Sequence, residues 1–336
     1  MIRVLVVDDS PVVRRVLTDA LHRHRDFEVV GGAEDPYAAR EAVLRLRPDV
    51  LTLDLELPRM DGLRFLEKLM RHFPIPTVVV SSRVATHPET AARALALGAA
   101  GVVAKPAPNV APGAPEFGEA LAAAVRAAAA RARRVLAIGA STGGPVALER
   151  VLSALPAHAP GTVVVQHMPG AFTASFADRL NAACTIEVRE ARDGDAVVPG
   201  LALIAPGGRH LVLQRAAADD AARGAHYTVR VKDGPPVHHQ RPAVDVLFES
   251  VARHVGADAV GVLLTGMGAD GAKGLLAMRE AGAHTIAQDE HTCVVFGMPK
   301  EAIKLGAAEA VVPLAEVPGA ILRALASPAP DRLAVV

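Results

Sequence analysis

The opening residues MIRVLVVDDSPVVRRVLTDALHRH, numbered 1–24, decide the fold class of the first part of the chain. The run Ile2–Val7 is apolar except at Arg3, and Val12–His24 repeats its apolar side chains at helical spacing. Short apolar strands that alternate with amphipathic helices are typical of a parallel sheet covered by helices on both faces. The stretch therefore predicts an α/β fold that begins with a buried strand.

The same alternation continues along the chain and restarts after a domain boundary that we expect near residue 134. Apolar runs that we interpret as strands lie at 50–53, 77–80, 102–103, 135–139, 162–165, 259–265 and 284–287. Prolines and glycines at 106–115 interrupt regular structure, and Glu116–Arg134 has the pattern of a helix with a basic end. We therefore expect a first domain at 1–107, a helix and linker at 108–134, a second domain at 135–327 and a tail at 328–336.

One stretch of the second domain has a different character. Turn signals follow each other closely between Thr185 and Val231, at Asp193-Gly194, Pro199-Gly200 and Pro206-Gly207. Closely spaced turns between short β-rich runs are typical of hairpins. The sequence therefore predicts a doubly wound parallel sheet with an inserted β-hairpin region for the second domain.

The composition excludes several classes of protein. The 336 residues hold 36 basic and 36 acidic side chains, with a net charge of +3 over residues 1–134 and −3 over residues 135–336. An acidic second domain is a poor DNA binder, and 3% aromatic residues offer few stacking platforms for single-stranded nucleic acid. The two cysteines fit no disulfide or zinc pattern, and no apolar stretch reaches 18 residues. We therefore expect a cytoplasmic protein that binds no nucleic acid and inserts into no membrane.

Charged side chains follow the expected strands of the first domain. Asp8 and Asp9 come after the first strand, Asp54 follows the run at 50–53, and Lys105 follows the last run. Ligands of open parallel sheets bind beyond the carboxyl ends of the strands, so these groups converge on one edge. Neighbouring carboxylates repel by about 4 kcal/mol per close pair, a penalty that a bound Mg²⁺ removes. In the alternative interpretation, Asp8 and Asp9 only cap the helix that follows them.

Residues 1–106 resemble the receiver domain of two-component response regulators, which has a flavodoxin-like fold. The matching segments are VLVVDDS at 4–10, LTLDLELPRMDG at 51–62 and VVAKP at 102–106. The resemblance implies that Asp54 is the phosphoacceptor and that Lys105 neutralises the phosphoryl group. It implies these Mg²⁺ ligands: Asp9 and Asp54 directly, Asp8 through water, and Glu56 through its backbone carbonyl. Ser81 would supply the switch hydroxyl, with the adjacent Ser82 as the alternative, and Val102 stands where receivers often carry an aromatic side chain.

The segment VLAIGASTGGP at 135–145 combines an apolar strand, a glycine-rich turn and a helix start. Three interpretations of Ser141 compete. A phosphate-cradling loop would require a GxGxxG pattern or a P-loop lysine, and neither is present. Alternatively Ser141 is a helix N-cap, or it is a nucleophile, because the segment GASTG at 139–143 fits the GxSxG pattern of a serine on a strained turn.

A nucleophilic serine requires an imidazole base and a carboxylate that orients it. His167 follows the run at 162–165, at the carboxyl end of an expected strand, although a histidine taken alone is more often structural. Asp270 and Asp289 also lie near expected strand ends, and spacing does not decide between them. A triad in the order serine, histidine, aspartate would differ from the order found in α/β-hydrolases.

Residues 135–325 resemble the catalytic domain of the chemotaxis protein-glutamate methylesterases, the CheB family. The matching segments are IGASTGGP at 138–145, QHMP at 166–169, RPAVDVLFES at 241–250, LLTGMGADGA at 263–272 and FGMPKEA at 296–302. The resemblance implies a triad of Ser141, His167 and Asp270, and it selects Asp270 over Asp289. The pair His238-His239 departs from the family, which usually carries an arginine near this position.

The resemblance also implies a reaction and its partners. The expected enzyme is a phosphorylation-activated serine esterase that hydrolyses glutamyl 5-methyl esters on chemoreceptors, with glutamine deamidase activity as a second reaction. Its phosphodonor is a chemotaxis histidine kinase, Mg²⁺ serves receiver phosphorylation, and the esterase chemistry needs no cofactor. The glycine-rich turns make the backbone N–H groups of Thr142 and Met267 the expected oxyanion donors. Two other classes compete: a receiver with a DNA-binding output domain, and a nucleotide-binding enzyme that uses the Gly143-Gly144 turn.

Overall fold

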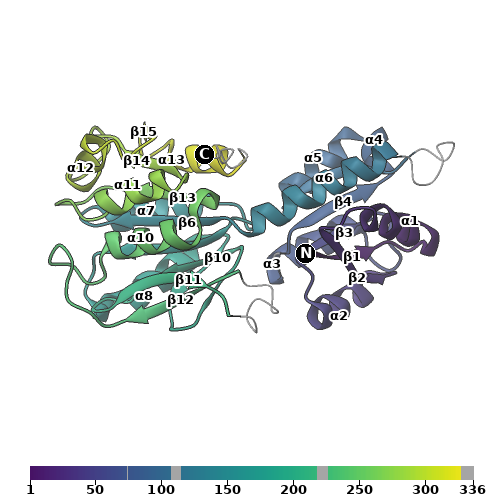
Figure 1. Cartoon of the computed structure of the whole chain (residues 1–336), viewed down its shortest axis with the longest axis horizontal. Helices are drawn as coiled ribbons and strands as arrows, with labels where there is room; N and C mark the ends of the chain where they lie inside the picture. Colours follow the sequence, from purple (N-terminus) through teal and green to yellow (C-terminus); the bar gives the residue numbers. More distant parts are fainter. Residues whose placement is uncertain (74, 107–114, 218–225, 327–336) are drawn as a thin grey trace. The chain divides into compact units, whose positions relative to one another are not determined.

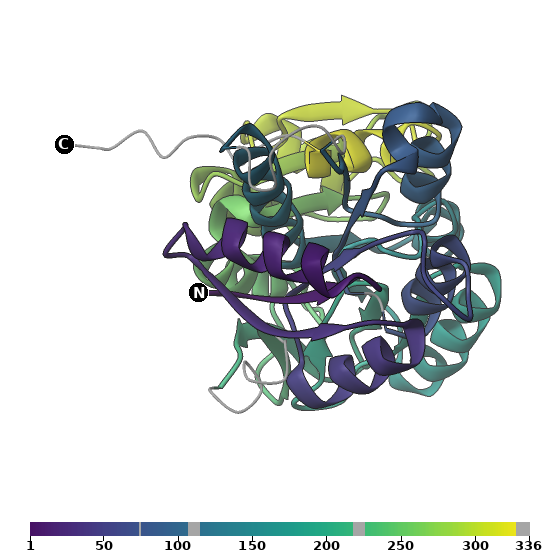
Figure 2. The ribbon, with the colours of Figure 1, turned by 90° about the vertical axis from the view of Figure 1, so that its right-hand side faces the viewer.

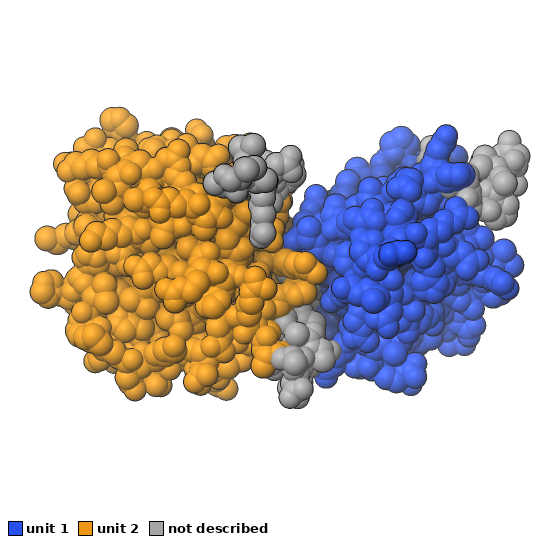
Figure 3. All heavy atoms as spheres, in the orientation of Figure 1, with its two compact units in different colours: residues 1–132, 222–224 blue, residues 133–221, 225–336 orange. Residues whose placement is uncertain are grey.

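The structure is a computed structural model that describes residues 1–73, 75–106, 115–217 and 226–326. These residues form two compact units, of which the first ends at Ala132 and the second begins at Arg133 (Figure 3). The expected linker segment at 108–114 and the expected tail at 328–336 lie outside the described residues. Within the described ranges, no helix is long and apolar enough to cross a membrane.

The first unit is a five-stranded parallel sheet with helices on both faces (Figures 1 and 2). Its strands are β1 (Ile2–Val7), β2 (Phe27–Ala33), β3 (Val50–Leu53), β4 (Thr77–Ser81) and β5 (Gly101–Ala104). Its helices are α1 (Pro11–His22), α2 (Pro36–Leu46), α3 (Gly62–His72), α4 (Arg83–Thr86), α5 (Pro88–Ala96) and α6 (Pro115–Ala132). The order β2-β1-β3-β4-β5 reverses between β1 and β3, which is where such sheets bind ligands.

The apolar stripes of the helices determine which face of this sheet they cover. Leu17 of α1 and Leu121 of α6 are buried in one core, whereas α2, α3 and α5 contribute to the core on the opposite face. Arg126 of α6 also forms two hydrogen bonds with the carboxylate of Asp26, at 2.6 and 2.9 Å. The helix that follows residue 114 is therefore packed as part of the first unit.

The second unit contains a seven-stranded parallel sheet and a three-stranded antiparallel sheet (Figure 1). The larger sheet has the order β15-β14-β13-β6-β7-β10-β8 and the smaller one β11-β12-β9. The strands are β6 (Val135–Ala140), β7 (Gly161–Gln166), β8 (Glu187–Glu190), β9 (Ala196–Val197), β10 (Leu201–Ile204), β11 (His210–Arg215), β12 (Tyr227–Lys232), β13 (Ala259–Leu263), β14 (His284–Gln288) and β15 (Ala310–Val312). The helices are α7 (Gly144–Ser153), α8 (Gly170–Ala183), α10 (Val244–His254), η1 (Gly256–Asp258), α11 (Ala272–Glu280), α12 (Met298–Lys304) and α13 (Val317–Ala326).

Helices cover both faces of the seven-stranded sheet, which confirms the doubly wound architecture. α7, α8 and α13 share one core with the sheet, while α10, α11, α12 and the three-stranded sheet share the other. The strand order reverses between β6 and β13. The carboxyl ends of β6, β7 and β13 therefore surround the place where an open α/β sheet binds its ligand.

The stretch with closely spaced turns contributes to both sheets. β11 and β12 pair antiparallel, which confirms the expected hairpin region. In contrast, β8 and β10 extend the large sheet in parallel, because β10 is apolar at all four positions and needs cover on both faces. The hairpin region is therefore smaller than the turn signals predict.

Candidate active site

The fold gathers Ser141, His167 and Asp270 from three distant parts of the sequence. Ser141 directly follows β6, His167 directly follows β7, and Asp270 lies in the loop after β13. These strands are neighbours, because β6 pairs in register with β7 on one side and with β13 on the other. The three side chains therefore share the sheet edge where the strand order reverses.

A sharp turn presents Ser141 between β6 and α7. The Ser141 N–H donates to the carbonyl of Thr265 at 3.0 Å, and its own carbonyl accepts from Gly144 N–H at 2.8 Å. The N-cap of α7 is Gly143, with φ +82°, so Ser141 is not the N-cap. A Cβ on Gly144 would lie 2.0 Å from Oε1 of Gln166, so this glycine permits close packing within the turn.

Ser141 and His167 line the same pocket, which has a volume of about 550 Å³. Its walls mix polar and apolar side chains. The other lining residues are Thr142, Gly143, Pro145, Gln166, Met168, Pro169, Phe172, Ser175, Phe176 and Arg179. A pocket of this size admits an amino-acid side chain to the serine.

His167 and Asp270 form a buried pair. Nε2 of His167 lies 2.8 Å from Oδ2 of Asp270, and the two side chains are 5% and 1% exposed. An ionised carboxylate only accepts hydrogen bonds, so the imidazole proton is assigned to Nε2. Nδ1 is buried and has no hydrogen-bond partner among the described residues, so its lone pair is available to take a proton.

The surroundings of Asp270 favour its charged form. The backbone N–H groups of Val244 and Asp245, at the start of α10, donate to its carboxylate at 2.8 and 2.9 Å. Burial alone would raise the pKa of Asp270, but the hydrogen bonds from His167 and these two amides outweigh it and hold the pKa below its ordinary value. Asp289, in contrast, accepts from Thr292 N–H in its own loop. The structure brings Asp270, and not Asp289, to His167.

Two backbone amides near Ser141 are available as oxyanion donors. Neither Thr142 N–H nor Met267 N–H donates a hydrogen bond to another described residue. Thr142 lines the pocket. Gly266 lies so close to the serine that a Cβ there would be 2.7 Å from Cβ of Ser141, so the segment that carries Met267 runs beside Ser141.

Three buried polar residues to which the sequence assigned no role hold these turns together. Nε2 of Gln166 donates to the carbonyls of Ser141 and His167 at 2.9 and 3.0 Å. The Thr265 hydroxyl donates to the Thr142 carbonyl at 2.9 Å, while Gln288 Oε1 accepts from Thr265 N–H. A polar residue that ends an apolar strand is the sequence signal for this role, as in VVVQ at 163–166 and TIAQ at 285–288.

The acidic cluster of the first unit lies at the reversal point between β1 and β3. Nζ of Lys105 lies 2.7 Å from Oδ2 of Asp8 and 2.6 Å from Oδ2 of Asp54. Burial and the charge of Asp54 raise the pKa of Asp8 against the opposing effect of Lys105. Burial would lower the pKa of Lys105, but its two carboxylate partners raise it overall. The lysine therefore carries the positive charge that keeps this cluster stable.

The same cluster fits a divalent cation. Asp8, Asp9 and Asp54 each offer an oxygen, and these atoms lie within 4.8 Å of one another. Oδ1 of Asp54 is buried and accepts no hydrogen bond from a described residue, so it is free to coordinate a metal. Carboxylate oxygens are the ligands that Mg²⁺ prefers.

The remaining receiver positions lie around this cluster. Ser81 ends β4, is buried, and pairs in register with Ala104 next to Lys105. Ser82 is exposed, and its hydroxyl donates to Oε2 of Glu56 at 2.7 Å. Val102 lies in β5 and is half-buried. Of the two serines, Ser81 therefore lies beside Lys105, whereas Ser82 is hydrogen-bonded to Glu56.

Comparisons with known proteins match both units of the chain. The CheB methylesterase model matches residues 136–321, and the response regulator receiver domain model matches residues 4–111. A protein-glutamate methylesterase/protein-glutamine glutaminase of Syntrophus aciditrophicus is 49% identical over 96% of this chain and 98% of its own. The Salmonella typhimurium protein of that name is 50% identical over 94% of this chain and 95% of its own.

A solved structure resembles the second unit. The catalytic domain of the Thermotoga maritima CheB methylesterase is 40% identical and covers 56% of this chain and 97% of its own, with a TM-score of 0.53. The receiver model matches the first part of the chain and the methylesterase model the second, and the relatives are about 50% identical over almost the whole length. The chain belongs to the CheB methylesterase family, with a response regulator receiver domain ahead of its catalytic domain.

Proposed function

We propose that this chain is a phosphorylation-activated serine esterase that hydrolyses glutamyl 5-methyl esters on chemoreceptors and also deamidates glutamine. One observation carries the proposal: Asp270 holds Nε2 of His167, no described residue binds Nδ1, and His167 lines the same pocket as Ser141. The names of the curated relatives, which combine both activities, support the substrate class.

In the first half of the reaction, Nδ1 of His167 takes the Ser141 hydroxyl proton while Oγ attacks the ester carbonyl. The backbone N–H groups of Thr142 and Met267 donate to the oxyanion. The protonated imidazole then returns its proton to the methoxide oxygen, so that methanol leaves and a glutamyl ester of Ser141 remains. Asp270 stabilises the imidazolium and keeps the Nε2 proton in place.

In the second half, water replaces methanol. Nδ1 of His167 takes a proton from the water as it attacks the glutamyl–serine ester, and the serine oxygen recovers that proton as it leaves. The products are a glutamate side chain and the free enzyme. With glutamine as substrate, ammonia leaves in the first half in place of methanol, and the same glutamate is formed.

The receiver supplies the regulation in this proposal. Asp54 is the phosphoacceptor, the phosphodonor is a chemotaxis histidine kinase, and Ser81 is the hydroxyl that moves toward the phosphoryl group. Mg²⁺ would be held by Asp9 and Asp54 directly, by Asp8 through water and by the backbone carbonyl of Glu56. When bound, Mg²⁺ neutralises charge on the phosphoryl oxygens. Lys105, already beside Asp54, neutralises the charge that phosphorylation adds.

Methanol release from methylated receptor tests the proposal. The wild type should release methanol, faster with a small-molecule phosphodonor and Mg²⁺, and Ser141→Ala should release none. Ser153→Ala, at the far end of α7, is the matched control and should behave as wild type. A wild type without methanol release under either condition, or a Ser141→Ala variant that retains it, would overturn the proposal.

A further inference from the structure

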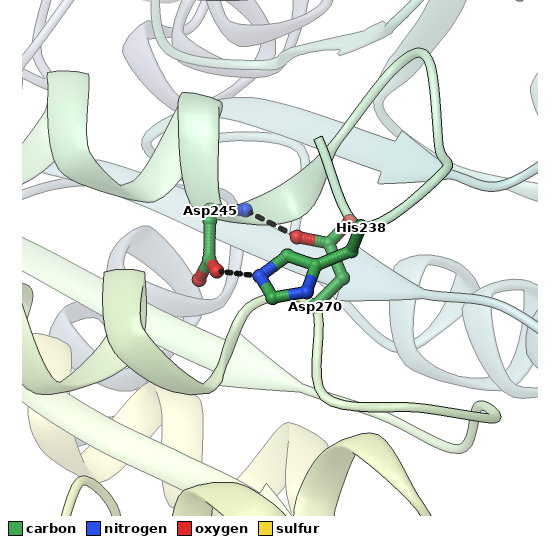
Figure 4. Close-up of side chains that lie close together, drawn as sticks. All are labelled: His238, Asp245 and Asp270. Atoms are coloured by element: carbon green, nitrogen blue, oxygen red, sulfur yellow. Dashed lines mark hydrogen bonds and ion pairs between the residues drawn. The ribbon is translucent and has the colours of Figure 1, made fainter. Parts of the chain in front are cut away.

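A second histidine–aspartate pair, His238 and Asp245, lies close to Asp270 (Figure 4). Nε2 of His238 is 2.9 Å from Oδ2 of Asp245. Asp245 belongs to the first turn of α10 and is buried, whereas the His238 side chain is 35% exposed. Neither residue lines the pocket of Ser141. The pair is therefore placed to act through Asp270 and not on the substrate.

Hydrogen bonds connect this pair to Asp270. Asp245 N–H donates to Oδ1 of Asp270 at 2.9 Å (Figure 4). Oδ1 of Asp245 accepts from Gly274 N–H of α11 at 2.7 Å. One polar atom from each of His238, Asp245 and Asp270 lies within 4.8 Å of the other two. All four carboxylate oxygens already accept from N–H groups, so the cluster is a hydrogen-bonded network and not a cation site.

Asp245 joins the two helices that enclose Asp270. Its backbone belongs to α10, whose first amides hold Asp270, and its carboxylate binds the first turn of α11, which follows Asp270 in sequence. A Cβ on Gly274 would lie 3.0 Å from Cα of Asp245 and 2.6 Å from Cβ of Phe248, so the helices touch through this glycine. A shift of Asp245 would therefore move the amides that orient the catalytic carboxylate.

The segment that carries His238 is held in a strained shape. His238 and His239 have φ values of +51° and +60°, in the left-handed region that favours glycine, and Val237 and Gln240 close the turn with hydrogen bonds of 3.0 and 2.8 Å. His210 fixes the flanks of the segment, with one ring nitrogen on the Pro235 carbonyl and the other on Ala243 N–H. Strained backbone of this kind persists where the surroundings fix it and clusters at functional sites.

We propose that His238 and Asp245 are positioning residues of the esterase, which hold the start of α10 so that its amides keep Asp270 aimed at His167. The inference rests on the proposed triad. The charged groups that act on Asp245 are Asp270, in the loop after β13, and His238, in the turn at 237–240. Burial and Asp270 raise the pKa of Asp245, and His238 and Gly274 N–H oppose them.

Substitutions in the turn at 237–240 distinguish the effect of the His238 hydrogen bond from the effect of the backbone conformation. His238→Leu removes the donor to Asp245, and His238→Gln restores a donor at the position of Nε2. His239→Leu is the matched control, because His239 has the same left-handed conformation in the same turn. We expect kcat to fall about tenfold or more in His238→Leu, with KM unchanged, and to stay near wild type in the other two. Equal losses in both leucine variants would overturn the proposal.

The Nε2 proton of His167 tests the same proposal without relying on turnover. In the hydrogen bond with Asp270 this proton gives a downfield signal, seen by NMR of histidine-labelled full-length chain. Because His238 holds Asp245, whose N–H orients the Asp270 carboxylate, we expect His238→Leu to shift or broaden this signal and His239→Leu to leave it unchanged. An unchanged signal in a folded His238→Leu variant would overturn the inference. An inactive wild type would instead overturn the proposed function.

Discussion

Replacing Asp270 by asparagine perturbs the proposed triad at its carboxylate. The carboxylate accepts hydrogen bonds from Val244 N–H, Asp245 N–H and His167, and an asparagine offers one oxygen for these three donors. If the new NH₂ takes the place of Oδ1, it faces Asp245 N–H. If it takes the place of Oδ2, it faces Val244 N–H and donates to Nε2 of His167. In the second case the imidazole proton moves to Nδ1, which can then no longer act as the base.

The size of both effects follows from these contacts. An aspartate-to-asparagine change that imposes the wrong tautomer lowers kcat about 10⁴-fold in the serine protease template, or about 5.4 kcal/mol of activation free energy. A buried N–H that loses its acceptor lowers the free energy of unfolding by about 1–3 kcal/mol. We therefore expect Asp270→Asn to stay folded while kcat for methanol release falls about 10⁴-fold.

The control is Asp289→Asn, which changes the other aspartate near a strand end. Asp289 accepts from Thr292 within its own loop and does not contact His167, so kcat should remain within about twofold of wild type. Initial rates of methanol release, with thermal unfolding of each variant, measure both quantities. A folded Asp270→Asn variant that keeps more than about a tenth of wild-type kcat would refute the assignment of Asp270 and the tautomer argument together.

Three further results are expected. Asp54→Ala should abolish stimulation by a phosphodonor and leave basal methanol release unchanged, because Asp54 belongs to the first unit. Gly144→Ala should lower the free energy of unfolding in urea by about 1–3 kcal/mol, because its Cβ would lie 2.0 Å from Oε1 of Gln166. Burial raises the pKa of the Cys184 and Cys293 thiols to about 11. Their thiolate fraction at pH 8 should therefore be about 100-fold below that of a thiol whose pKa is 9.0. The rate of reaction with a thiol reagent, before and after unfolding, measures this difference.

The positions of the site residues could be predicted because the topology of parallel strands is regular. Ser141 and His167 directly follow apolar runs, so they had to lie on one sheet edge. The choice between Asp270 and Asp289 could not be made from spacing, since both lie beyond strand ends. The order of the strands decides between them. Asp270 follows β13, which is adjacent to β6, whereas Asp289 follows β14, which lies one strand farther from β7. Sequence spacing does not encode strand order.

The elements that the sequence pattern does not predict are those with weak strand signals. β2 reads FEVVGGA, and its glycines reflect packing, since a Cβ on Gly31 would lie 2.6 Å from Cδ1 of Leu46. β8 reads EVRE and is an edge strand with one buried residue, Val188. Glutamine at a strand end, as at Gln166, gives no sign of which carbonyls it will bind. Tertiary contacts determine the strands β2 and β8 and the hydrogen bonds of Gln166, and the local sequence pattern does not predict tertiary contacts.

The two sites stabilise buried carboxylates by different means, and the difference fits the tasks that we propose for them. Asp8 and Asp54 are balanced by the single charge of Lys105, which contacts both carboxylates and which, in the proposed function, also faces the phosphoryl group. Asp270 is balanced by backbone N–H groups at the start of α10, which cannot leave without unfolding the helix. Burial raises the pKa of Asp8 in spite of Lys105, whereas the hydrogen bonds to Asp270 hold its pKa below the ordinary value in spite of burial. A regulatory site must accept a change of charge, whereas a catalytic base needs a partner whose charge stays constant through every turnover.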